Sequence, residues 1–424
     1  WGGAAQKRHL PQNGKRVPDE PESVRKRSAL AVERLTRQFP GWSRTANYLC
    51  RRDFQLYQDT RVTYLPEGAL LLRELIEQAK KAERFIFLEY FILAEGRLWS
   101  ELEKILCAKA HEGVEVKIIF DDFGNIKRFR GETIDRLRDA GVEVFIFNPV
   151  HEYVNRLYFN YRDHRKIACF DGDVAYTGGV NIADEYANLI ERFGYWKDSG
   201  VCLEGEGAWG LTASFIRMCV NLGGVMHNEH DYYRPHTPVK SEGFCQPFTD
   251  GPQNNPDNPA EDVFLQMISG ARRFLYITTP YFIPDESLMR ALCIAGDGGV
   301  DVRLMLPGKP DHWYADCVAE SYFGELIKHG VKVYRYIPGF LHGKSIMVDR
   351  EAAFVGSANM DYRSFELDYE CGVMVYSAPM IESLLEDMDM IVDRSHLVTA
   401  EEWAKRSVLR RVFEPLLRLF AIWM

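Results

Sequence analysis

The sequence predicts an α/β protein built from two similar domains, each with a mixed sheet flanked by helices. Three observations lead to this fold class. The 424 residues, 46% of them hydrophobic, suffice for two ordinary globular domains. The chain matches itself at an offset of roughly 170–190 residues, which indicates a duplicated unit rather than a short-period solenoid. Short apolar strands alternate with helices in both copies, as they do in sheets covered on both faces.

The elements of the two copies follow one another in the same order. Each copy opens with a predicted helix, over residues 70–82 and 262–271, and continues with a buried strand, over residues 84–91 and 273–282. The next strand follows a helix that ends at glycine, a common helix terminator. A further helix and strand complete the match. These later segments are residues 113–120 with 299–306, and residues 137–147 with 326–336.

Composition divides the chain into four predicted parts. Residues 226–260 are rich in Pro, Asn, Asp and Gly, the composition of an exposed connection, so the domain boundary is placed there. The four parts are a basic N-terminal segment (1–55), a first repeat domain (56–240), a second repeat domain (241–395) and a basic amphipathic C-terminal helix (396–424).

Charge is distributed unevenly along the chain. The net charge of -9 argues against a general nucleic-acid binder, and no nucleic-acid partner is expected. Residues 1–52 carry 12 Lys and Arg against 4 Asp and Glu, and residues 402–424 carry 5 against 2, whereas the remainder carries 35 against 55.

No run of about 18 uncharged apolar residues predicts a bilayer-spanning helix. Nine scattered cysteines without a C-x-x-C pair fit reduced thiols facing a cytosol.

Each copy carries the pattern H-x-K-x-x-x-x-D. Residues i and i+2 of a strand point to the same side, so each histidine and its lysine are expected to face one site. Asp171 and Asp349 lie five residues beyond the lysine, where a carboxylate commonly fixes a turn, and we assign them a structural role within the motif. The candidate catalytic set is His164, Lys166, Asp171, His342, Lys344 and Asp349.

An asparagine and an acid follow the motif in each copy. Asn181 and Asn359 end the segments G-G-V-N and G-S-A-N and are predicted to bind a phosphate. Asp198 and Glu370 occupy matching positions, and an acid orients an imidazole through its second nitrogen. Lysine charge and amide donors would stabilise the oxygens of a phosphate in the transition state, so the chemistry requires no metal and no cofactor.

With these motifs the sequence resembles the phospholipase D superfamily and, within it, the bacterial cardiolipin synthases. The resemblance covers most of residues 56–395. The second copy has Ser357, whose hydroxyl is a predicted phosphate ligand. The first copy has Gly179 where the family pattern often has Ser. The first copy therefore lacks this hydroxyl, which puts one phosphate contact in doubt. The segments that carry the resemblance beyond the core motif are NYRDHRKI (160–167), NIADEY (181–186), TPYFIP (279–284), GFLHGK (339–344) and RSFE (363–366).

The resemblance implies two domains packed about a pseudo-twofold axis, with both motifs meeting in one active site at their interface. One histidine would attack the phosphorus of phosphatidylglycerol and form a phosphohistidine, while the other protonates the departing glycerol. A second phosphatidylglycerol would then accept the phosphatidyl group, giving cardiolipin and glycerol. By analogy with relatives His164 is the nucleophile and His342 the acid/base, with Asp198 and Glu370 as orienting acids, although the two roles can be exchanged.

This implied chemistry needs access to a bilayer. The expected partner is an anionic membrane surface, and the expected location is the bacterial cell membrane with the catalytic region facing the cytoplasm. Residues 403–424 set apolar side chains along one stripe, as in an interfacial helix or in a helix packed on the protein core. The basic residues 24–39 could either contact anionic lipid headgroups or form a charged helix face exposed to water. Members of this family usually carry hydrophobic N-terminal spans before the catalytic region, and the sequence opens at Trp1 without such spans. We therefore expect a truncated or processed chain.

Three other functions fit the same motifs. A hydrolytic phospholipase D would use water as the acceptor. A phosphodiesterase or nuclease of the same fold is disfavoured by the acidic body, and a catalytically inactive lipid-binding scaffold is disfavoured by the intact duplicated motifs. Candidate pocket-lining residues are Glu89, Tyr90, Tyr281, Phe282 and Asp311.

Overall fold

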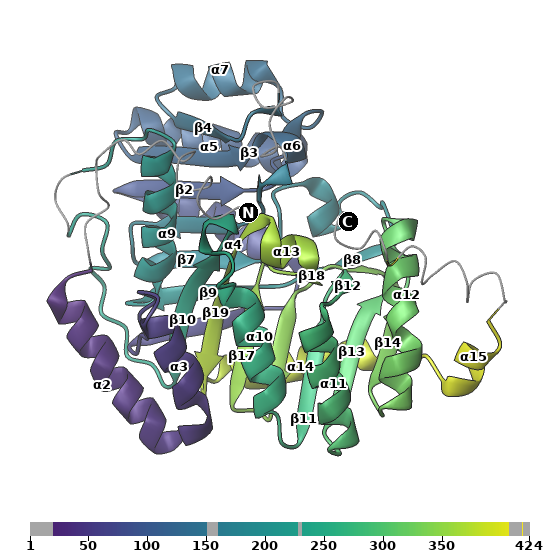
Figure 1. Cartoon of the computed structure of the whole chain (residues 1–424). Helices are drawn as coiled ribbons and strands as arrows, with labels where there is room; N and C mark the ends of the chain where they lie inside the picture. The colour runs from purple at the N-terminus through teal and green to yellow at the C-terminus, as the bar shows by residue number, and fades with distance from the viewer. Residues whose placement is uncertain (1–19, 151–159, 228–230, 407–417, 419–424) are drawn as a thin grey trace.

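The computed structural model describes residues 20–150, 160–227, 231–406 and 418 (Figure 1). Two large sheets, each flanked by helices, follow one another along the chain and lie against each other. The predicted fold class, two similar α/β domains with mixed sheets, is confirmed.

The first sheet has seven strands in the order β1-β9-β7-β6-β2-β3-β4. Strands β2, β3 and β4 run parallel to one another, and the other neighbours pair antiparallel, so the sheet is mixed. The bounds are β1 Thr60–Leu65, β2 Phe85–Tyr90, β3 Glu115–Asp121, β4 Glu143–Phe147, β6 Lys166–Phe170, β7 Val174–Gly178 and β9 Gly200–Gly205.

The second sheet repeats this arrangement, with β20 added beside its last strand. Its order is β10-β19-β17-β16-β11-β13-β14-β20, so each strand of the first copy has a counterpart at the same place. In both sheets the strand that follows the H-x-K pair, β6 or β16, lies at the centre. The bounds are β10 Phe244–Asp250, β11 Phe274–Thr278, β13 Asp301–Pro307, β14 Lys332–Tyr336, β16 Ser345–Val348, β17 Ala352–Gly356, β19 Asp368–Tyr376 and β20 Ser395–Leu397.

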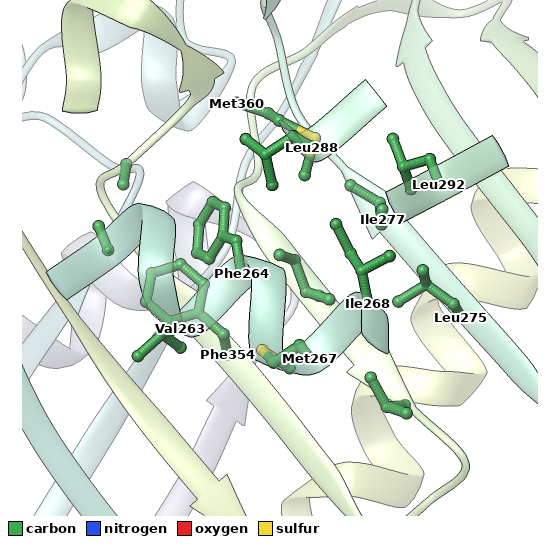
Figure 2. Packing of buried hydrophobic residues seen from close by; sticks show 14 of the residues in the cluster. Val263, Phe264, Met267, Ile268, Leu275, Ile277, Leu288, Leu292, Phe354 and Met360 are labelled. Atoms are coloured by element: carbon green, nitrogen blue, oxygen red, sulfur yellow. The ribbon is translucent and has the colours of Figure 1, made fainter. Parts of the chain in front are cut away.

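Helices cover the outer face of each sheet, where they bury apolar side chains. In the second domain, Val263, Phe264 and Met267 of one helix pack with Leu275 of β11 and Phe354 of β17 (Figure 2). The first domain has an equivalent outer core. The outer helices are α4 Gly68–Lys81, α5 Arg97–His111 and α7 Gly131–Asp139 in the first domain, and α10 Pro259–Gly270, α11 Glu286–Asp297 and α12 Trp313–Lys328 in the second.

A third apolar core joins the two domains. It combines inward side chains of both sheets, such as Phe87 of β2 and Val373 of β19, with side chains of α9 (Ala208–Asn221) and α14 (Met380–Asp393). Helix α9 of the first domain contacts β10 of the second, and α14 of the second contacts β1 of the first. The inner faces of the two sheets are therefore buried together, which holds the central strands of both domains in one orientation.

The basic N-terminal segment packs on the protein. Helices α2 (Glu22–Gln38) and α3 (Ser43–Cys50) bury Leu35 and Leu49 in the outer core of the second domain. The indole of Trp42 between them donates a hydrogen bond to Glu351. Residues 22–50 of the predicted N-terminal segment therefore pack against the second domain. The charged side chains of these residues lie on the remaining, exposed face.

The predicted C-terminal amphipathic helix lies mostly outside the described residues. Helix α15 (Ala400–Ala404) starts with a capping box formed by Thr399 and Glu402. Beyond this helix only residues 405, 406 and 418 are described. Within the described ranges, no helix combines the length and apolar character needed to cross a membrane.

Candidate active site

Two short cross-domain strand pairs position the two histidines. Strand β5 (Arg162–Asp163) pairs in parallel with the start of β19, and β15 (Gly339–Leu341) pairs in parallel with β8 (Tyr195–Lys197). The residue after each pair is a motif histidine on one strand and an acid on the other. The peptide N–H groups of the histidines extend the pairing, that of His164 to the carbonyl of Tyr369 and that of His342 to the carbonyl of Lys197.

Each histidine therefore contacts the acid of the other domain. His164 Nδ1 lies 2.9 Å from Glu370 Oε1, and His342 Nδ1 lies 2.6 Å from Asp198 Oδ2. The four groups come together as expected, but the acids are exchanged between the copies rather than kept within them. Because Nδ1 is engaged in both rings, Nε2 is the nitrogen that can act on a substrate.

Burial and neighbouring charges shift the pKa values of the two histidine–acid pairs, and the two acids shift in opposite directions. Burial lowers the pKa of His342 to about 4, with Lys344 acting in the same direction. Burial disfavours the charge on Asp198, but His342 and Lys344 outweigh it and hold the pKa of that carboxyl below its usual value. Burial raises the pKa of Glu370 to about 7, against opposing interactions with Lys166 and two serines. Burial also lowers the pKa of His164 well below its usual value. Both imidazoles are therefore neutral at pH 7 in the absence of substrate.

The two lysines lie directly beside their histidines. Lys344 Nζ lies 3.1 Å from each ring nitrogen of His342 and donates a hydrogen bond of 2.6 Å to the His342 carbonyl. Lys166 Nζ donates to the carbonyl of His164. Burial lowers the pKa of both ammonium groups, to about 7 for Lys344. Two buried cations at the base of the site will attract an anionic group such as a phosphodiester.

The histidines and asparagines line one cavity of about 740 Å³ between the domains, within the usual size of ligand pockets. Asn181 holds its place through a bond from the Ile92 peptide N–H to its side-chain oxygen and a 2.7 Å bond from its amide to the Tyr186 hydroxyl. Asn359 keeps a buried amide oxygen without a hydrogen-bond partner among the described residues.

Ser357 differs from the prediction that it binds phosphate. Its hydroxyl donates to Glu370, accepts the peptide N–H of Cys371 at 2.9 Å, and lies outside the cavity lining. It therefore supports the acid that orients His164. At the matching position, a Cβ atom on Gly179 would lie 2.3 Å from Asp198 Oδ1. The absence of a side chain at Gly179 thus leaves room for the Asp198 carboxylate.

Asp171 and Asp349 lie at the far ends of β6 and β16, away from the cavity lining. The Asp171 carboxylate accepts three peptide N–H groups, those of residues 83–85, and the Asp349 carboxylate accepts those of residues 272–274 at 2.8–2.9 Å. Both residues have positive φ, near 50°, which Asp tolerates better than most residues. The structural role assigned to them fits these contacts, and neither carboxylate faces the cavity that His164 and His342 line.

We expect Asp349→Ala to lower the free energy of unfolding by about 2–4 kcal/mol, because three peptide donors lose a charged acceptor and Ala disfavours positive φ. Turnover per folded molecule should not change. Urea unfolding, together with turnover of the native fraction, measures both effects. Asp349→Asn is the control, since Asn tolerates the same backbone conformation. Loss of turnover at unchanged stability would restore a catalytic role for Asp349.

The cavity is also lined by residues for which no role was predicted from the sequence. Arg363 and Asp368 form an ion pair of 3.2 Å beside His164, and Arg363 begins the RSFE segment, which was a signal available in the sequence. Of the candidate pocket residues, Tyr281 and Asp311 line the cavity, and the Tyr281 hydroxyl donates to Asp311 at 2.6 Å. Three candidates, Glu89, Tyr90 and Phe282, are buried outside the lining.

One group in the site has the composition of a metal centre. His164, Asp368 and Glu370 place one possible ligand atom each within 4.8 Å of one another. The same Glu370 carboxylate already binds the His164 ring, so a cation there would compete with the orientation of that histidine. An assay with a chelator is therefore part of the functional test below.

This fold, with His164 and His342 facing one cavity, fits an enzyme that acts on a phosphodiester. A family model described as cardiolipin synthase, PLD-like domain, matches residues 72–191 and 264–392. Cardiolipin synthase 2 of Bacillus anthracis is 35% identical over 380 residues, which cover 89% of this chain and 73% of that protein. A cardiolipin synthase of Clostridium perfringens is 36% identical over 385 residues, which cover 88% of this chain and 77% of that protein. The chain belongs to the cardiolipin synthase family of the phospholipase D superfamily and is a phospholipid phosphatidyltransferase.

Solved structures show the same fold at low sequence identity. The phosphatidylserine synthase of Haemophilus influenzae Rd KW20 superimposes with a TM-score of 0.64 at 17% identity, covering 87% of this chain and 94% of that one.

Proposed function

We propose that this protein transfers the phosphatidyl group of one phosphatidylglycerol to a second phosphatidylglycerol, forming cardiolipin and glycerol through a phosphohistidine on His164. The observation that carries this proposal is the pair of crossed histidine–acid contacts facing one cavity. Relatives named cardiolipin synthase at about 35% identity support the choice of substrate.

In the first half of the reaction, His164 Nε2 attacks phosphorus and the bond from phosphorus to the glycerol headgroup oxygen breaks. His342 takes up a proton when the phosphodiester anion binds, and as the imidazolium it gives the proton on Nε2 to that oxygen, so neutral glycerol leaves. Lys166 and Lys344 stabilise the negative charge that spreads over the phosphoryl oxygens. The ionised Asp198 favours the imidazolium form of His342, which supports its role as the acid.

In the second half, His342 takes the proton from a hydroxyl of the incoming phosphatidylglycerol. The resulting oxygen attacks phosphorus, the bond from phosphorus to His164 breaks, and cardiolipin forms. Both histidines then return to their starting protonation. His342 thus donates the proton in the first half and accepts one in the second, because the second half reverses the chemistry of the first.

The test uses vesicles of labelled phosphatidylglycerol with EDTA, measuring lipid products and released glycerol, with His164→Ala as the control. We expect cardiolipin and glycerol in equal amounts in the presence of EDTA, and neither product in the control. Phosphatidic acid in place of cardiolipin would show that water is the acceptor and would make the protein a hydrolytic phospholipase D. Loss of turnover with EDTA would instead indicate a cation at the group around Asp368.

We also propose that the enzyme acts on an anionic membrane surface, at the cytoplasmic side of a bacterial cell membrane. None of the nine cysteines, all within the described residues, forms a disulfide bond, which supports a reducing compartment. Protease treatment of intact spheroplasts should leave the chain uncut, and cleavage before lysis would place the catalytic region on the outer side.

We expect kcat/KM for phosphatidylglycerol to fall mainly above pH 7, because below pH 7 the ionisation of Glu370, whose pKa is about 7, offsets the loss of protonated His342. Both active groups act in their protonated forms, and in the free enzyme their pKa values are about 4 for His342 and about 7 for Lys344. The decline should steepen above pH 7, where Lys344 loses its charge. Because the bound phosphodiester anion favours both protonated forms, kcat should decline at a higher pH than kcat/KM.

Lys344→Arg provides the control for this pH profile. The guanidinium stays charged, so the steeper decline above pH 7 should disappear even where the variant is slower. A profile of kcat/KM that is flat between pH 5 and 9 would contradict the assignment of proton donor and cation.

A further inference from the structure

Exposed apolar side chains concentrate around the mouth of the active-site cavity. Among the described residues, thirteen large apolar side chains are exposed, and six of them lie in three short segments, residues 122–130, 188–194 and 309–314. We call these three segments the cavity rim. The six side chains are Phe123, Ile126, Leu189, Ile190, Trp313 and Tyr314.

The three segments surround one opening although they are distant in sequence. Each contributes residues to the cavity lining, for example Phe123, Arg192 and Tyr314. The first segment contains helix α6 (Asp122–Asn125) and the third leads into α12, so both domains contribute. Because Phe123 and Tyr314 are exposed and also line the cavity, the cavity reaches the surface at the rim.

The charge of the rim is opposite to that of the protein body. The three segments carry five Lys and Arg against three Asp and Glu, whereas residues 53–401 as a whole carry 35 against 55. Lys127 and Arg130 are exposed on the first segment. Arg128 and Arg192 both contact the single buried carboxylate of Glu185, at 2.7 and 3.2 Å. Cations beside exposed aromatic and aliphatic groups are the composition of a surface that binds anionic lipid.

We propose that the cavity rim is the surface that docks on an anionic bilayer, with Ile126, Ile190 and Trp313 entering the boundary between headgroups and acyl chains. This inference rests on the proposed function, because a phosphatidyl donor and acceptor must reach the histidines from the bilayer. The basic side chains then contact lipid phosphates, and a phospholipid headgroup enters the cavity without leaving the membrane. The occupant of the rim is thus the lipid surface rather than a protein.

The test compares two triple variants for binding to vesicles of phosphatidylglycerol and phosphatidylcholine by co-sedimentation. The rim variant carries Ile126→Ser, Ile190→Ser and Trp313→Ser, at side chains that are 56%, 51% and 64% exposed and lie outside the cavity lining. The matched control replaces three equally exposed side chains on α2, α14 and α11, away from the rim, and consists of Leu30→Ser, Met390→Ser and Ile294→Ser.

We expect the rim variant to bind phosphatidylglycerol vesicles about 10- to 100-fold more weakly than the parent chain, while the control binds as the parent does. Parent binding should weaken with added salt and with phosphatidylcholine in place of phosphatidylglycerol. Equal vesicle affinity of the rim and control variants would overturn the proposal. So would a change in oligomeric state of the rim variant without a change in vesicle affinity, because the rim would then be a protein interface.

Turnover of a short-chain phosphatidylglycerol, dispersed as monomers, separates this proposal from the proposed function. The rim variant should retain turnover of the monomeric lipid and lose it on vesicles. Equal loss on both substrates would make the rim part of the substrate site and overturn the docking role. If the parent turns over neither lipid, the proposed function fails, and the vesicle affinities still decide the docking proposal.

Discussion

His164→Ala is expected to reduce the formation of cardiolipin below detection, by more than about 10⁴-fold, because no covalent intermediate can form. His342→Ala should lower turnover of phosphatidylglycerol by about 10²–10⁴-fold, since the departing glycerol then lacks its proton donor. Product formation from labelled phosphatidylglycerol measures both losses. His329→Ala is the matched control, because His329 also pairs with an aspartate, Asp297, but lies outside the cavity.

A phosphodiester substrate with a nitrophenol leaving group assigns the two roles. Nitrophenol leaves without a proton, so His342→Ala should form a labelled protein adduct that turns over slowly, and His164→Ala should form none. The reverse pattern would show that His342 is the nucleophile and that the roles are exchanged. Label on neither variant, with label on the parent, would mean that both imidazoles are needed before phosphorus is attacked.

Asp198→Asn and Glu370→Gln are each expected to lower kcat by about 10³–10⁴-fold, the size of loss seen when a histidine in a catalytic triad loses its orienting carboxylate. Each amide keeps the shape of the acid but cannot hold the imidazole tautomer that leaves Nε2 free, either to attack phosphorus (His164) or to transfer a proton (His342). Both carboxylates are completely buried, so their effect on the substrate passes through the histidine they contact. The change in kcat, and its pH profile, is the measurement.

Double variants test the exchange of acids between domains. Asp198→Asn should cost nothing further in a His342→Ala background, which retains measurable turnover, because both changes disable the same imidazole. Asp250→Asn, a buried acid that binds the peptide N–H of Ala260, is the control for the loss of a buried carboxylate. Full activity of Asp198→Asn would contradict the orienting role, provided that its thermal unfolding matches that of the parent.

Much of the fold could be predicted because the evidence for it is local. The apolar runs before His164 and His342 alternate with helical segments in the same order twice, and the structure has two sheets with the same strand order. The N-terminal helices were harder to place, since the basic face of α2 is visible in its sequence while the partner of Leu35 is not. Which core a short amphipathic helix joins depends on surfaces formed by residues far along the chain.

The sequence by itself determined which chemical groups the site contains, because the spacing of histidine, lysine and asparagine repeats along strands whose side-chain direction follows a period of two. Only the tertiary structure decided how they work together. Glu370 lies 206 residues from His164, and Asp198 lies 144 residues from His342. Their pairing depends on β5 adding to β19 and β15 adding to β8 across the domain interface, which neither repeat encodes alone. The same packing turned Ser357 toward Glu370 and brought the three segments of the rim around one cavity.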